Sequence, residues 1–307
     1  MNQFKLSNGV ELPQIALGPA GIGYNPRPAS LPQNRLLNLG YRAWRKFIIR
    51  PNERKEWINS VAYAFKEGYR LIDNSATYGN MDALKEAIDK SGLRREEIIL
   101  TTRIDNRTQA KGEKAIRAEL ETSLKWLGTD YIDILQFHWP VPEHYLATWR
   151  VMEQLYREGK CRVIGVANCH EHHLRAIFDI AEIQPQINQI EVHPLFTQKP
   201  LIEFCKQNDI QVQSYTPIAR FDDRLMRLPV LRRIAQAQNK TIVQVILRWH
   251  VQQGLLPVVR SKHPSRINEN FEIFDFSLSP DEMDRIDAIN INARVRYDPD
   301  NCDFSIL

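Results

Sequence analysis

Short apolar segments rich in β-branched residues alternate with longer amphipathic segments along most of the chain. A short apolar segment bounded by polar residues predicts a buried strand, and apolar residues at every third or fourth position predict a helix. The clearest helical patterns cover residues 52–68, 111–128, 143–160 and 241–254. The eight predicted strands cover residues 14–18, 71–75, 98–104, 131–138, 162–168, 187–192, 210–218 and 255–259.

This alternation predicts one α/β domain over residues 1–307. Strands separated by helices favour parallel pairing through right-handed crossovers. Because no composition break or long linker divides the chain, a single closed (β/α)₈ TIM barrel fits better than an open doubly wound sheet. The preceding segment 4–12 predicts an N-terminal β-hairpin that plugs one end of the barrel, with a type I′ turn at Asn8-Gly9.

An insertion separates the first predicted strand from its helix. It covers residues 19–51, where a βα loop normally needs about 2–6 residues, so the first βα loop is enlarged. The chain has a net charge of +4, but residues 27–54 contain seven basic residues and one acid, so the rest is slightly acidic. This local excess predicts an anionic substrate or an acidic partner at the barrel mouth; the alternative is a solvated basic helix without a ligand.

The composition is that of a soluble globular protein, 43% hydrophobic and 25% charged. The four cysteines have no CxxC spacing, which favours a reducing compartment, and we expect a cytoplasmic protein. No apolar segment approaches the roughly 18 residues needed to cross a bilayer, and the N-terminus has no signal-peptide pattern. We therefore expect neither a membrane nor a nucleic-acid partner.

Polar residues stand where the predicted strands end. In a barrel of this kind the active site lies at those ends. A phenol, whose ordinary pKa is about 10, becomes a useful acid beside a cation, a carboxylate can hold that cation, and an imidazole can orient a carbonyl. The set therefore predicts proton transfer to a carbonyl oxygen, although each residue alone could be an ordinary polar strand end. The residues are Asp73, Tyr78, Arg103, His138, Asn168, Gln189 with Glu191, and Tyr215.

Seven segments resemble the aldo-keto reductase family in order and spacing, and the resemblance covers nearly the whole chain. It implies an NADPH-dependent (β/α)₈ oxidoreductase that moves a hydride directly between nicotinamide and a carbonyl compound or alcohol. The segments are EGYRLIDNSATYGN, IILTTRI, DILQFHWP, RVIGVAN, NQIEVHP, SYTPIA and RSKHPSRINEN.

The resemblance also implies roles for individual residues. Asp73 matches the aspartate of the catalytic tetrad, Tyr78 its general acid and His138 its substrate-orienting histidine. Trp139, next to His138, has either a substrate-facing or a structural role, and residues 293–307 are similar to the C-terminal loop that closes over the substrate; that segment could instead pack on the barrel wall.

Other residues match the family's NADP contacts. The resemblance implies that Asn168 and Gln189 hold the carboxamide and that Tyr215 stacks on the nicotinamide. Arg260, Ser261 and Arg266 match the residues that bind the 2′-phosphate, and guanidinium groups near a helix start suit a phosphate. The residues that match adenine contacts are Glu269 and Asn270.

The sequence departs from the family pattern in three places: Arg103 replaces the tetrad lysine, Met81 stands where a glutamate is usual, and the first loop is enlarged. A guanidinium stays charged and can lower the pKa of Tyr78, but it is bulkier than an ammonium and cannot relay a proton. We favour a working reductase or dehydrogenase. The alternatives are an NADP-binding redox sensor with weakened catalysis and a redox-neutral isomerase or lyase acting on a sugar-like substrate.

Two motif-like segments are discounted. Residues 18–23, GPAGIG, have the spacing GxxGxG and contain Pro19, so they do not predict a dinucleotide-binding loop. Residues 169–173, CHEHH, could place Cys169 and His172 or His173 on one helical face. The spacing is not HExxH, however, and no fourth ligand is evident. We therefore expect a solvated helix start without a metal, with a zinc site as the alternative.

Overall fold

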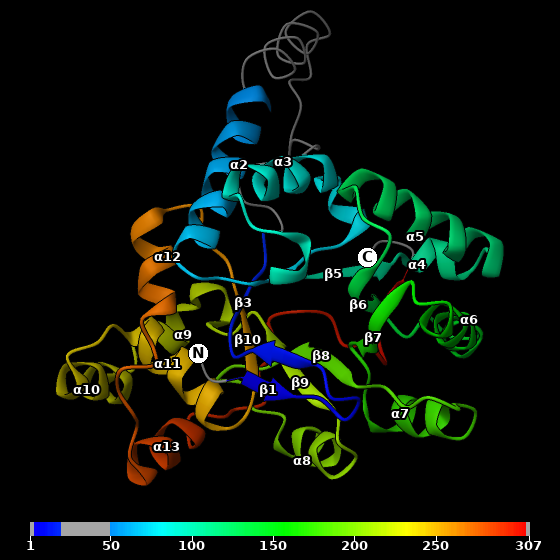
Figure 1. The fold of residues 1–307 in the computed structure, drawn as a ribbon. Coiled ribbons are helices and arrows are strands. Elements are labelled where there is room, and N and C mark those ends of the chain that lie inside the picture. Colours follow the sequence, from blue (N-terminus) through cyan, green and yellow to red (C-terminus); the bar gives the residue numbers. More distant parts are fainter. Residues whose placement is uncertain (1–2, 20–49, 305–307) are drawn as a thin grey trace, which may run out of the picture.

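The computed structural model describes residues 3–19 and 50–304. Eight parallel strands close into a barrel in the order β10-β3-β4-β5-β6-β7-β8-β9, and helices surround it (Figure 1). This confirms the predicted (β/α)₈ fold, with each strand starting and ending within a few residues of its predicted range. The barrel strands are β3 (Ala16–Leu17), β4 (Leu71–Asp73), β5 (Ile99–Ile104), β6 (Ile132–Phe137), β7 (Cys161–Ala167), β8 (Ile187–Glu191), β9 (Gln211–Tyr215) and β10 (Leu256–Val259).

The helices bury an apolar side against the barrel and expose the other, as their periodicity predicts. Gly128, with φ +66°, ends α5, and a capping box between Thr241 and Gln244 begins α11. The helices are α2 (Arg50–Lys66), α3 (Met81–Ser91), α4 (Asn106–Gln109), α5 (Glu113–Leu127), α6 (Tyr145–Arg157), α7 (Glu171–Phe178), α8 (Lys199–Gln207), α9 (Asp223–Met226), α10 (Pro229–Gln238), α11 (Ile242–Gln252), α12 (Pro264–Phe271) and α13 (Pro280–Asp287), with 3₁₀ turns η2 (Ala76–Tyr78), η3 (Arg95–Glu97) and η4 (Ala219–Phe221).

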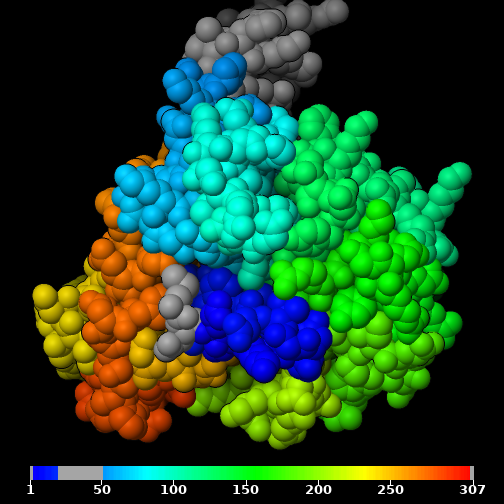
Figure 2. Space-filling model, in the orientation of Figure 1, coloured from blue at the N-terminus to red at the C-terminus, as the bar shows by residue number. Residues whose placement is uncertain are grey.

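The N-terminal hairpin closes one end of the barrel. Its strands β1 (Gln3–Lys5) and β2 (Glu11–Pro13) are antiparallel. Leu6 and Leu12 form one apolar cluster with side chains from the barrel strands, among them Ile134 of β6. Figure 2 shows the hairpin, in blue, across the centre of this face. The plug is therefore confirmed, and an active site must lie at the other end.

The hairpin turn differs from the predicted type I′ turn. That turn requires positive φ at both central residues, whereas Gly9 has φ +84° and Asn8 is not in the positive-φ region. The Gly9 amide donates to the Leu6 carbonyl, and the Leu6 amide donates to the Val10 carbonyl. The Asn8 side chain instead accepts from the Val10 amide and donates to the carbonyl of Arg162, which ties the turn to the barrel.

Residues 20–49, which contain most of the predicted basic insertion, lie outside the described residues. Helix α2 begins at Arg50. One member of the basic group, Arg54, forms ion pairs with Asp82 and Glu86 of α3, so its charge is neutralised within the fold. No described helix is long and apolar enough to cross a membrane. All four cysteines are free thiols, and three of them are buried.

Candidate active site

The polar residues predicted at the strand ends gather at one end of the barrel, because all eight strands are parallel. This is the end opposite the hairpin. Asp73 ends β4, Arg103 lies near the end of β5 and Tyr215 ends β9. His138 directly follows β6, and Asn168 directly follows β7.

Arg103 is the centre of a buried polar network. Its side chain is 1% exposed, and Nη2 pairs with Asp73 Oδ1. The same Nη2 atom donates to Gln189 Oε1 at 2.7 Å, and Nη1 donates to the Asn74 carbonyl at 3.0 Å. Gln189 Nε2 donates to Asp73 Oδ1 at 2.8 Å, which closes a triangle between β4, β5 and β8.

The pairing with Asp73 offsets the cost of burying a cation. An unpaired charge in the interior is strongly destabilising, whereas a hydrogen-bonded pair of opposite charges is tolerated. Burial lowers the pKa of Arg103, but Asp73 and Tyr78 together raise it by more, so the guanidinium remains charged. Arg103, which the resemblance places at the position of a lysine, is therefore a permanent cation fixed at both of its terminal nitrogens.

Tyr78 is placed beside this pair by a short 3₁₀ turn. In η2 the Ser75 hydroxyl accepts from the Thr77 amide, and Gly79, with φ +64°, ends the turn directly after Tyr78. The Tyr78 and His138 rings meet edge to face, with their centroids 6.3 Å apart. Both side chains are half-buried, so the phenol and the imidazole share one partly exposed position at the barrel mouth.

The surroundings hold both groups in their neutral forms. Burial raises the pKa of Tyr78, and the Arg103 guanidinium offsets only part of the rise. Burial also lowers the pKa of His138 to about 3, assisted by the charges of Arg103 and Arg296. At neutral pH the phenol therefore keeps its proton, and the imidazole is uncharged and can donate one N–H bond.

Of the predicted nicotinamide residues, Asn168 and Tyr215 bond to each other, and Gln189 belongs to the Arg103 network. Asn168 has left-handed φ (+61°); its Oδ1 accepts from the Tyr215 hydroxyl at 2.7 Å, and its Nδ2 donates to the His138 carbonyl at 2.9 Å. Gln189 Nε2 donates to both Asp73 and Gln213. These bonds leave one Nδ2 hydrogen of Asn168 and one lone pair of Gln189 Oε1, a donor and an acceptor that match a carboxamide.

The predicted phosphate and adenine residues lie together after β10. Arg260 and Arg266 are exposed, whereas Ser261 is buried and its hydroxyl accepts from the His263 amide. Helix α12 has no side-chain cap at its N-terminus, but Pro264 has no amide hydrogen and the Arg266 and Ile267 amides donate to the His263 carbonyl. The exposed guanidinium groups are therefore the main groups there that suit an anion. The predicted adenine residues are both on α12: Glu269 accepts from the Thr241 hydroxyl, and Asn270 is buried.

The loop after β9 is conformationally strained. Thr216 has φ +48°, and Ala219, Arg220 and Phe221 all have positive φ, which non-glycine residues rarely adopt. The Thr216 hydroxyl is also buried without a hydrogen-bond partner. Strain and an unpartnered polar atom at the mouth are typical of a loop shaped to hold a ligand.

The C-terminal segment, residues 294–304, lies beside the same site. The buried Glu191 carboxylate accepts from the amides of Val295 at 2.6 Å and Arg296 at 3.2 Å. Further along, the Phe304 ring packs edge to face against the buried Trp139 ring, with the ring centroids 6.4 Å apart. Trp139 therefore contacts the C-terminal segment, and its predicted substrate contact stays a prediction.

Three residues of the site were not singled out from the sequence. Gln213 Oε1 accepts from Gln189 Nε2, and the position of Gln213 two residues before Tyr215 on a strand was the available signal. Asn74 contributes a backbone carbonyl, for which a sequence holds no signal. Arg296 places a positive charge near Tyr78 and His138 from far along the chain. Met81, the second departure, is buried and its sulfur accepts from Asn74.

Comparison with known proteins finds reductases among the relatives of this chain. Glyoxal reductase of Bacillus subtilis is 38% identical over 96% of this chain and 95% of its own length. Methylglyoxal reductase DkgA of Escherichia coli is 36% identical over 90% of this chain and 98% of its own. The crystal structure of an aldo-keto reductase from Bombyx mori in complex with NADP has a TM-score of 0.82 and 28% identity, covering 97% of this chain and 96% of that one. The sequence model of the aldo/keto reductase family matches residues 38–291, and this chain belongs to that family.

Proposed function

We propose that this protein reduces small 2-oxoaldehydes, such as glyoxal and methylglyoxal, with NADPH. The observation that carries the proposal is the pairing of Tyr78 with His138 at the barrel mouth, next to the buried ion pair of Arg103 and Asp73. The names of the relatives supply the substrate class. An enzyme that catalyses carbonyl reduction agrees with the family and with these relatives.

Two residues at the barrel mouth have different roles at the carbonyl oxygen of the substrate. The His138 imidazole, neutral at physiological pH, orients the oxygen through an N–H bond, and the Tyr78 hydroxyl gives it a proton. Because the pKa of Tyr78 is raised, the phenol is present as a proton donor, which favours reduction over alcohol oxidation at neutral pH. Arg103 limits that rise in pKa, and Asp73 fixes Arg103.

The described residues fit NADPH at three places. Asn168 and Gln189 offer one donor and one acceptor to the carboxamide, and the strained loop at Thr216 has an unpartnered hydroxyl. Arg260 and Arg266 near the start of α12 suit the 2′-phosphate that distinguishes NADPH from NADH. When bound, NADPH supplies the hydride that adds to the carbonyl carbon.

A preference for anionic substrates remains a prediction. Most of the basic residues on which it depends lie outside the described residues, and Arg54 is already paired. Arg296 is the described cation that favours it, since its side chain is exposed and its charge acts on Tyr78 and His138.

A titration with NADPH, followed by addition of 2-oxoaldehydes and other carbonyl compounds to the complex, tests the proposal. We expect tight binding and rapid loss of the NADPH absorbance with glyoxal or methylglyoxal. Tight binding without oxidation by any carbonyl compound would instead support a redox sensor. Conversion of a sugar without a change in cofactor absorbance would support an isomerase or lyase.

A further inference from the structure

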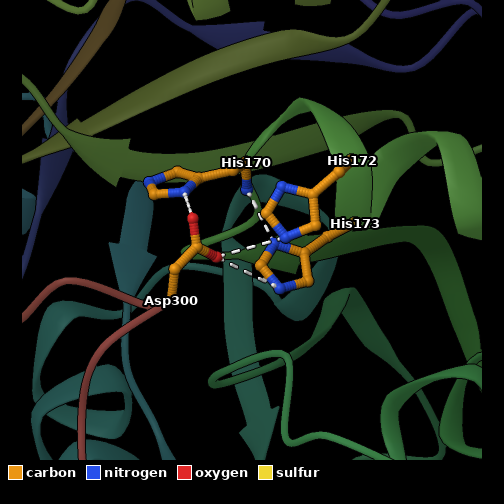
Figure 3. Close-up of side chains that lie close together, drawn as sticks. All are labelled: His170, His172, His173 and Asp300. Atoms are coloured by element: carbon orange, nitrogen blue, oxygen red, sulfur yellow. Dashed lines mark hydrogen bonds and ion pairs between the residues drawn. The ribbon is translucent and has the colours of Figure 1, made fainter.

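Three histidines at the start of α7 and one aspartate of the C-terminal segment meet at the rim of the barrel (Figure 3). We propose that His170, His172, His173 and Asp300 bind a Zn²⁺ ion that fastens the C-terminal segment to α7. The proposal departs from the expectation that this segment is only a solvated helix start. It does not depend on the proposed function.

The four side chains are already close enough to share an ion. One nitrogen of each histidine and one Asp300 oxygen all lie within 4.8 Å of one another. Asp300 Oδ2 is 2.6 Å from His170 Nδ1, and Asp300 Oδ1 is 3.2 Å from His172 Nε2 and 3.6 Å from His173 Nε2. A tetrahedral zinc site with bonds of about 2.0–2.1 Å places its ligand atoms roughly 3.3 Å apart. Side-chain movements of about 1 Å would complete it.

The types of ligand atom in the cluster favour one kind of metal ion. Three imidazole nitrogens and one carboxylate oxygen suit Zn²⁺, whereas Ca²⁺ and Mg²⁺ prefer oxygen ligands throughout. Four protein ligands also fill a tetrahedral shell, as in sites that hold structure rather than activate water. The aspartate is the fourth ligand that was not evident in the CHEHH segment, since it comes from a position 130 residues away.

Metal binding would exchange two hydrogen bonds for metal bonds. His170 Nε2 accepts from Arg294 at 2.7 Å, and His173 Nδ1 accepts from the His170 amide at 3.2 Å. A neutral imidazole bound to a metal through one nitrogen carries its proton on the other, so both acceptors become donors. For His170 a carboxylate partner is near, because Asp298 Oδ1 lies 3.9 Å from Nε2, and such outer carboxylates commonly orient metal-bound histidines.

The cluster is partly open to solvent and includes one residue of the C-terminal segment that flanks the candidate active site. The side chains of His172 and Asp300 are 63% and 43% exposed, so the ion can enter from solvent. Along the C-terminal segment, Asp300 lies between the contact of Val295 with Glu191 and the contact of Phe304 with Trp139. A bound ion would therefore strengthen the attachment that Asp300 already makes to His170, in the segment that lies beside the candidate active site.

Calorimetric titration of the tag-free, chelator-treated protein with Zn²⁺ tests the proposal, with Co²⁺ absorption as the readout of tetrahedral coordination. We expect one ion per chain. His172→Gln and Asp300→Asn should each weaken Zn²⁺ binding at least tenfold, in line with the loss of one ligand. His172 is exposed and its one ion pair in the described residues is with Asp300, so His172→Gln should fold normally.

Glu171→Gln is the matched control, because Glu171 lies between two of the histidines but pairs with Arg175 and not with the cluster. It should bind Zn²⁺ within about twofold of the unmodified chain. Saturating Zn²⁺ should also slow proteolysis within residues 294–304 at least fivefold, and this protection should be absent in His172→Gln. Equal Zn²⁺ affinity of the unmodified protein and His172→Gln, or an octahedral Co²⁺ spectrum, would overturn the proposal.

Discussion

Arg103 and Asp73 form a buried ion pair at the barrel mouth, and the resemblance to the family implies a lysine at the position of Arg103. The guanidinium is held by the protein itself, since its Nη1 and Nη2 atoms donate to Asn74, Asp73 and Gln189. Its positive charge lowers the pKa of the Tyr78 phenol and so offsets part of the rise that burial causes. We therefore expect the arginine to take the electrostatic role that the resemblance gives to a lysine.

Two substitutions of Arg103 distinguish the effect of its positive charge from the effect of its hydrogen-bond geometry. Arg103→Lys keeps the cation but cannot bridge all three partners, so we expect a loss of about 1–3 kcal/mol in the free energy of unfolding and a turnover number at least equal to the original. Arg103→Met leaves the Asp73 carboxylate buried without a cation and should cost about 3–5 kcal/mol. Urea unfolding and steady-state kinetics of both variants measure this. A large loss of turnover in a stably folded Arg103→Lys would show that the guanidinium has a contact with substrate of its own.

The pH profile of kcat/KM for reduction should show no change from titration of His138 near neutral pH. Since the pKa of His138 is lowered to about 3, the imidazole stays neutral as the pH falls through its ordinary value of about 6.5. The pKa of Tyr78 is raised, so the proton donor is lost only above its ordinary value of about 10. We expect kcat/KM to be constant from about pH 5 to about pH 9 and to fall at higher pH. A fall in kcat/KM between pH 7 and pH 6 would contradict the assignment for His138.

Arg266 should discriminate between the two nicotinamide cofactors. If its guanidinium pairs with the 2′-phosphate, Arg266→Ala removes a charge-assisted bond worth about 1.5–3 kcal/mol, which raises the Kd for NADPH roughly 10–150-fold. The Kd for NADH should change less than about twofold. Fluorescence titration measures both. Arg285→Ala on α13 is the control, since Arg285 pairs with Asp281 on its own helix; an equal loss for both cofactors in Arg266→Ala would refute the assignment.

Glu191 should control the C-terminal segment. Its buried carboxylate accepts from the amides of Val295 and Arg296 and also pairs with His193 Nε2, so Glu191→Ala leaves all three groups without this partner. We expect faster proteolysis within residues 294–304 and a KM raised several-fold, with kcat changed less. Glu203→Ala removes an exposed carboxylate on α8 and should alter neither quantity. A Glu191→Ala protein with unchanged proteolysis and KM would show that these bonds do not hold the segment.

Periodicity alone predicted the barrel, because each strand and helix satisfies its own burial pattern. It also placed Arg103 and Asp73 at the same end, since parallel strands align their carboxyl ends. Periodicity could not predict the other hydrogen-bond partners of Arg103, because Gln189 is 86 residues away in the chain and the Asn74 acceptor is a backbone carbonyl. The Asn8-Gly9 turn was mispredicted because the Asn8 side chain bonds to Arg162, a tertiary contact that local preference does not include.

The most direct test of the central claim is a single turnover with NADPH that carries deuterium at the transferable position of the nicotinamide. We predict that glyoxal or methylglyoxal is reduced to a product alcohol with one deuterium on carbon, which mass spectrometry detects. Tyr78→Phe should bind NADPH normally but slow this step about 10²–10⁴-fold, because the proton donor is missing. Tyr156→Phe, on α6, should react at the original rate. Product without deuterium, or an unchanged rate in Tyr78→Phe, would contradict direct hydride transfer with Tyr78 as the acid.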